Sequence, residues 1–276
     1  MFDNVCRYLT EHFSADIASW LLGEPVALTR LSPTELSLQP LRADALILLQ
    51  SETVVLHVEF QTQPDAEIPF RMADYRLRVF RRFPQKRMRQ VVVYLRESAS
   101  PLVYQTRFEL PGTRHEFQVI RLWEQPVATF LTSPGLLPFA ILAQTGDRAG
   151  VLQTVAQELE AIEDLTRRSD LTASAGILAG LVLERELIQR LLRQELMRES
   201  VIYQEILQEG EARGKAEGKA EGKAEGKAEG KMEVAMNLLT FGMPIAQIAE
   251  VTGLTLEQVS QLQADRPEAG EAEENQ

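Results

Sequence analysis

Asp44, Glu59 and Gln61 carry the side chains whose types and spacing could do chemistry in this chain. Mg²⁺ prefers oxygen ligands, and proteins commonly hold it through one or two carboxylates plus water and substrate phosphates. Two acids and an amide can serve that purpose only if the surrounding elements bring their side chains to one place.

The segments around these residues predict a β-hairpin. Residues 46–49 and 54–58 are mostly apolar, and the second run is rich in strand-forming side chains. Residues 50–53 between them are polar and form the expected turn. In the simplest register, Leu49 faces Val54 across that turn.

That register places Asp44 opposite Glu59, where Cβ atoms of paired residues are roughly 5 Å apart. Two carboxylates so placed repel each other unless a divalent cation lies between them. Because side chains alternate along a strand, Gln61 shares the face of Glu59. The pattern predicts a hydrolytic site for Mg²⁺ or Mn²⁺. The alternative is an ordinary hairpin with both acids exposed, since a slip of one residue puts them on opposite faces.

Asp44, followed after a strand's separation by Glu59-Phe60-Gln61, resembles the PD-(D/E)XK nuclease core. It resembles more closely the Rpn family of recombination-promoting nucleases and putative transposases, where the last motif residue is often Gln rather than Lys. Residues 69–78 also resemble the helix that follows the motif in that family. The resemblance extends over residues 1–140.

This resemblance implies an α/β fold with a restriction-endonuclease-like core, in which helices flank a central mixed sheet, followed by an all-α C-terminal region. It implies a metal-dependent DNA endonuclease, linked to recombination or transposition. Asp44 and Glu59 would hold Mg²⁺ or Mn²⁺, and Gln61 would position the attacking water or a phosphate oxygen. Such proteins often add an acid from the first helix, for which Glu11 is the best candidate. The alternative is a catalytically inactive nuclease-like protein that mediates assembly or associates with DNA.

A basic segment follows the hairpin, although the chain has a net charge of −11. Residues 70–96 contain nine Arg or Lys and one acid. Apolar side chains at three- and four-residue spacing predict a helix over residues 69–83, with Arg76 beside the apolar stripe. Guanidinium groups pair bidentately with phosphate, so Arg71, Arg76 and Arg78 are candidate DNA contacts. The alternative is a solvated basic face. No base-reading element is evident, and we expect little sequence specificity.

Other segments show clear periodicity. Residues 4–22 predict an amphipathic helix or a helix pair, and residues 35–39, 91–95 and 117–123 predict strands. The expected division of the chain is a nuclease-like core (1–140), a helical extension (141–209), a Gly-Lys-Ala-Glu repeat that is a linker or a helix (210–231), a small helix-turn-helix-like module (232–263) and an acidic disordered tail (264–276).

The repeat places like charges four residues apart and a glycine in every turn, and both features weaken an isolated helix. It is therefore either a flexible tether or a helix supported by a partner, such as a second copy of the chain. The last predicted helix of the module lacks Lys and Arg, which favours packing or regulation over DNA recognition.

Composition favours a cytoplasmic protein. No apolar run approaches the ~20 residues of a membrane helix, and the N-terminus lacks the pattern of a signal peptide. Cys6 is the only cysteine, which excludes an internal disulfide framework.

Overall fold

The computed structural model describes residues 2–24, 26–31, 46–192 and 200–264. Contacts divide the chain into two compact units, residues 1–207 and 208–276. Asp44, the strand expected at residues 35–39 and the expected acidic tail from residue 265 onward lie outside the described residues.

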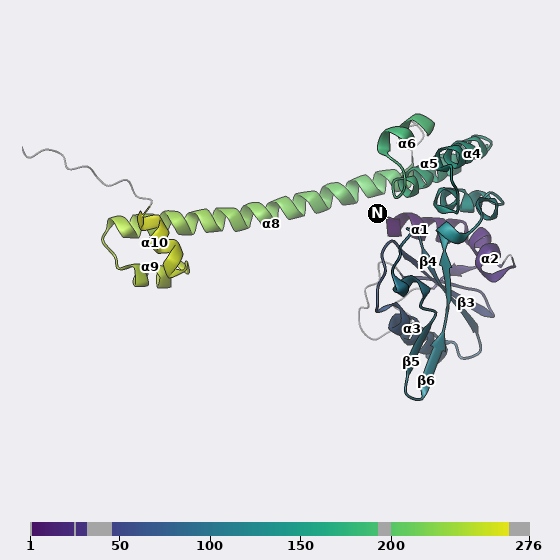
Figure 1. Ribbon diagram of the computed structural model, residues 1–276, viewed down its shortest axis with the longest axis horizontal. Helices are drawn as coiled ribbons and strands as arrows, with labels where there is room; N and C mark the ends of the chain where they lie inside the picture. Colours follow the sequence, from purple (N-terminus) through teal and green to yellow (C-terminus); the bar gives the residue numbers. More distant parts are fainter. Residues whose placement is uncertain (1, 25, 32–45, 193–199, 265–276) are drawn as a thin grey trace, which may run out of the picture. The chain divides into compact units, whose positions relative to one another are not determined.

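A mixed sheet of five strands forms the centre of the first unit, in the order β1-β2-β3-β4-β7. Figure 1 labels two of these strands, β3 and β4. The β1–β2 and β2–β3 pairs are antiparallel, whereas β3–β4 and β4–β7 are parallel. Helices flank this sheet, which confirms the expected α/β class. The strands are β1 (Thr29–Arg30), β2 (Leu46–Gln50), β3 (Val54–Gln61), β4 (Arg87–Tyr94) and β7 (Gln118–Arg121).

The predicted register of the β2–β3 hairpin is wrong by two residues. Leu46, rather than Asp44, lies opposite Glu59. A shift of two residues preserves the face to which each side chain points, because strands alternate with a period of two. Glu59 and Gln61 share a face as predicted, because they are two residues apart on β3. Their side chains are hydrogen-bonded at 3.4 Å.

The error lies in the turn. The backbone N–H of Ser51 donates to the carbonyl of Val54 at 2.9 Å, and the Ser51 hydroxyl accepts from the N–H of Val54. The turn is thus tighter than the four polar residues suggested. Gln50 joins β2, where it pairs with Val55.

Helices cover both faces of the sheet. α1 (Phe2–His12) and α2 (Ser14–Leu22) pack on the larger core, as the predicted helix pair. α3 (Ile68–Arg82) covers the opposite face, close to the predicted bounds. Its apolar stripe is buried as expected at Met72, Tyr75 and Val79.

β3 shows the division between the two faces. Leu56, Val58 and Phe60 point to the larger core with α1 and α2. Val55 points to the smaller core under α3, and alternation places His57 and Glu59 on that same face. The α3 face is therefore the one that carries the polar side chains of β3.

Helical and irregular segments complete the first unit. Residues on both sides of the boundary expected at residue 140 share the larger core, including Phe139 and Leu152. A two-stranded sheet of β5 (Arg107–Leu110) and β6 (Thr113–Glu116) precedes β7. The remaining elements are η3 (Pro101–Tyr104), η4 (Leu122–Glu124), η5 (Val127–Phe130), η6 (Pro134–Leu142), α4 (Arg148–Glu160), α5 (Leu165–Ala179) and α6 (Arg185–Leu191).

The second unit is a small helical module. α8 (Val201–Thr240) contains the whole repeat, so the structure shows the helical alternative for residues 210–231. α9 (Ile245–Thr252) and α10 (Leu256–Ala264) are joined through Gly253, whose φ of +66° favours glycine. Self-association through these helices stays a prediction. The module's core consists of Ala235, Leu239, Ile248 and Val259.

Within the described part of the chain, no helix combines the length and the apolarity that a membrane span requires.

Candidate functional site

Three polar side chains of β3 lie in a row on the face that α3 covers: His57, Glu59 and Gln61. His57 is fully buried and Glu59 is 2% exposed. A buried carboxylate is costly unless charged or hydrogen-bonding groups surround it. The partners of Glu59 therefore define what this site can do.

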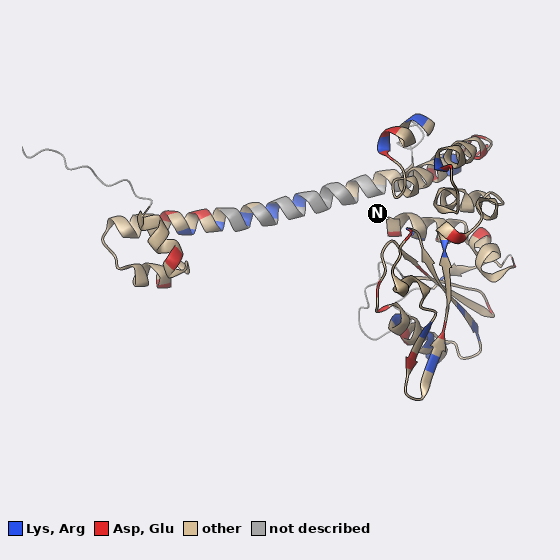
Figure 2. Cartoon of the chain, in the orientation of Figure 1, with Lys and Arg blue, Asp and Glu red and all other residues tan. Residues whose placement is uncertain are grey.

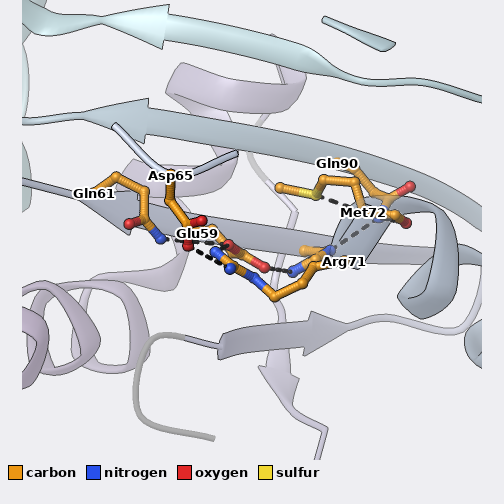
Figure 3. Close-up of polar contacts among 7 residues, drawn as sticks. Glu59, Gln61, Asp65, Arg71, Met72 and Gln90 are labelled. Atoms are coloured by element: carbon orange, nitrogen blue, oxygen red, sulfur yellow. Dashed lines mark hydrogen bonds and ion pairs between the residues drawn. The ribbon is translucent and has the colours of Figure 1, made fainter. Parts of the chain in front are cut away.

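Arg71 is the main partner of Glu59 (Figure 3). It lies in the first turn of α3, and its Nη2 is 3.0 Å from Glu59 Oε2. Its Nη1 is 2.6 Å from Oδ2 of Asp65, a residue of the loop that leads into the helix. Asp65 in turn accepts a hydrogen bond from the backbone N–H of Glu67. One guanidinium thus joins two carboxylates from separate elements.

His57 approaches the other oxygen of the same carboxylate. Its Nε2 lies 3.6 Å from Glu59 Oε1. The amide nitrogen of Gln90 lies 3.0 Å from His57 Nδ1 and donates to the Met72 carbonyl at 2.8 Å. Because an amide nitrogen can only donate, Nδ1 accepts and the imidazole proton sits on Nε2, toward Glu59. Gln90 therefore sets the tautomer that suits a carboxylate neighbour.

These contacts control the ionisation of Glu59. Burial raises the pKa of its carboxyl, but His57 and Arg71 outweigh burial, so the net shift is downward. Glu59 is an anion at neutral pH. The same negative charge, added to burial, raises the pKa of Tyr75 to about 12.

Of the residues predicted from sequence, the structure brings Glu59, Gln61 and Arg71 together. Arg71, expected to face DNA, is instead occupied by two carboxylates. Asp65 was missed by sequence reasoning, although its place just before a predicted helix start offered a signal. Asp44 lies outside the described residues.

The other predicted residues lie elsewhere. Glu11 belongs to α1, which packs on the opposite face of the sheet, and it pairs with Arg30 at 3.3 Å. Arg78 pairs with Asp74 one turn earlier in α3. Arg76 points to a separate pocket, described below.

A divalent metal would meet suitable oxygen atoms here. Glu59, Asp65 and the amide oxygen of Gln61 are the ligand types that Mg²⁺ takes. Arg71 already supplies a cation between the two carboxylates, so a metal would have to displace it from Glu59. Among the residues the structure describes, no three His, Cys, Asp or Glu side chains gather as a ready-made metal site.

Comparisons of the chain with family models, with curated proteins and with solved structures found no match.

Proposed function

We propose that this protein is a metal-dependent DNA endonuclease of the PD-(D/E)XK type that hydrolyses phosphodiester bonds. The observation that carries the proposal is the buried, ionised Glu59 at the end of β3, facing a second carboxylate across one shared cation. Glu59 comes from the sheet and Asp65 from the loop before α3, so the fold brings two acids from separate elements to one cation. Recombination or transposition is proposed only because of the resemblance to the Rpn family.

In this proposal Asp44, Glu59 and Asp65 hold Mg²⁺ or Mn²⁺. The bound metal would activate a water and stabilise the negative charge that develops on the phosphate. Gln61 positions the water or a phosphate oxygen through its amide. Arg71, released from Glu59, is then available to pair with the phosphate backbone.

Basic residues along α3 supply the proposed DNA contacts (Figure 2). Arg76 and Arg78 stay candidates. Arg81 and Arg82 at the helix end are exposed and extend the basic surface. Backbone contacts carry no direct sequence information, so we propose cleavage with little sequence preference.

A second candidate function follows if the contacts of Glu59 with Arg71 and His57 are structural rather than catalytic. Arg71 bonds to Glu59 Oε2 and His57 Nε2 faces Oε1 at 3.6 Å without a hydrogen bond, so Arg71 alone can neutralise the carboxylate without a metal. In that case the chain is a catalytically inactive nuclease-like protein, and the cluster joins α3 to the sheet.

A plasmid assay separates the two candidates. Purified protein is incubated with supercoiled plasmid and Mg²⁺ or Mn²⁺, with EDTA as the metal-free control. We expect nicking that Glu59→Gln and Asp44→Ala each reduce by about 100-fold or more, as removal of a metal ligand should. Glu52→Gln is the matched control, because Glu52 is an exposed acid in the turn of the same hairpin.

Nicking that persists in EDTA or in Glu59→Gln would contradict the proposed site. Absence of nicking with either metal, together with a folded protein, would favour the inactive alternative.

A further inference from the structure

A second polar region lies on the α3 face of the sheet, beyond Gln90. The first pair between β4 and β7 joins Val91 to Gln118, so residues 87–90 of β4 have a neighbouring strand on one side only. An open pocket of about 510 Å³ occupies this place. Its lining includes Arg76 from α3, Arg89 and Gln90 from β4, and His115, Glu116 and Phe117 at the end of β6.

Two nitrogen atoms of the pocket residues are buried without a partner. Arg76 Nη1 and His115 Nε2 have almost no exposed surface, and neither has a hydrogen-bond partner in the part of the chain that the structure describes. Buried donors are nearly always satisfied, because an unmet donor loses its water without replacement. The guanidinium nitrogen can only donate, and the imidazole nitrogen donates when it carries the proton, so an acceptor in the pocket would satisfy both atoms.

The charges around His115 point to a negatively charged acceptor. Its pKa is lowered by burial first, and then by Arg76 of α3 and His57 of β3. Glu116 opposes this shift, but its carboxylate is bonded to Arg114. An oxyanion would pair with the guanidinium of Arg76 and favour protonation of His115.

We propose that this pocket binds the phosphate group of a nucleotide or of nucleic acid. Arg76 and His115 are the donors to the phosphate, with Arg89 at the rim, where it also contacts Gln118. The volume is in the range of small-ligand sites and exceeds what a phosphate needs. Met88 and Phe117 add apolar surface against which a sugar or base can lie. The proposal does not depend on the proposed nuclease activity, although DNA is one source of the phosphate.

Binding is tested in EDTA with the full-length Glu59→Gln protein, so neither metal nor cleavage enters the result. The probes are inorganic phosphate, thymidine 5′-monophosphate and a 5′-phosphorylated single-stranded oligonucleotide, each measured by calorimetry. We expect Arg76→Gln to weaken phosphate binding by about tenfold or more, as loss of a charged hydrogen bond should. Arg185→Gln is the matched control, since Arg185 is an exposed arginine of α6 that belongs neither to the pocket nor to the basic surface of α3.

NMR of the His115 ring provides a second measurement. A bound phosphate should raise the pKa of His115 in the parent protein and leave it unchanged in Arg76→Gln. Arg76→Lys keeps the charge and should recover part of the affinity, which distinguishes a lost contact from a misfolded pocket.

The three probes distinguish the source of the phosphate. Tighter binding of the monophosphate than of the oligonucleotide indicates a free nucleotide, and the reverse order indicates nucleic acid; both orders support the pocket if Arg76 is required. The proposal is overturned if no probe binds, or if Arg76→Gln and Arg185→Gln bind equally well.

Discussion

Two arginines of α3 show how differently one residue type can be used on one helix. Arg71 joins the carboxylates of Glu59 and Asp65, whereas Arg76, five residues later, buries a guanidinium nitrogen that has no partner among the described residues. Both were predicted as DNA contacts from the sequence. The difference teaches that an arginine paired with a carboxylate must be released before it can bind a ligand, whereas an unpaired guanidinium nitrogen can bind one directly.

Gln90 lies between the two regions. Its amide nitrogen contacts His57, which faces Glu59, and the same side chain lines the pocket of Arg76. The Glu59 end of the polar face is thus closed by internal partners, and the Arg76 end is open to an anion.

The largest stability effect is expected at Arg71. Arg71→Met leaves the buried Glu59 carboxylate without its cation, and we expect a loss of about 2–3 kcal/mol, less than a fully buried pair because Arg71 is partly exposed. Urea unfolding followed by tryptophan fluorescence reports on the first unit, which contains both tryptophans. Adding Glu59→Gln should recover part of the loss. Equal losses in Arg71→Met and in Arg78→Met would show that the Glu59 pair is no stronger than a surface pair.

A smaller loss is expected at the link between the two regions. Gln90→Leu removes the donor to His57 Nδ1 and to the Met72 carbonyl, both buried, at a cost of about 1–2 kcal/mol. The same unfolding measurement applies, with Gln105→Leu at an exposed position as the control. A loss no larger than that of the control would mean that the hydrogen bonds of Gln90 to His57 and Met72 are not maintained in solution.

The free energy of unfolding should depend on pH through the ionisation of Glu59. Since the folded-state pKa is lowered from the ordinary 4.5, ionised Glu59 stabilises the fold above that pH, and the contribution is lost as pH falls through the folded value. In EDTA, the wild-type protein should therefore lose more stability on acidification below pH 4.5 than Glu59→Gln does. Parallel curves would contradict a lowered pKa.

The smallest effect is expected at Arg76. Arg76→Met removes a buried donor that lacks a partner and keeps most of the apolar stem, so we expect a change within about 0.5 kcal/mol in either direction. Thermal unfolding without phosphate measures it. A loss as large as that of Arg71→Met would erase the contrast between the two arginines.

Much of the fold could be predicted from local pattern. The helix expected over residues 69–83 is α3, and the helix pair of residues 4–22 divides at Phe13 into α1 and α2. The hairpin was also predicted, but its register was not, because the hydrogen bonds of Ser51 decide the length of the turn. Polar residues in a row do not reveal how tightly the chain reverses.

The site itself could be predicted only in part. Periodicity alone puts Glu59 and Gln61 on one face and Arg76 beside the apolar stripe of α3, because these positions follow from two residues per repeat in strands and 3.6 in helices. Which arginine meets Glu59 depends instead on how α3 packs across the sheet. Side chains at positions 71 and 76 point about 140° apart around the helix. Only the packing of α3 on β3 turns one toward the carboxylates and the other toward the open end of β4.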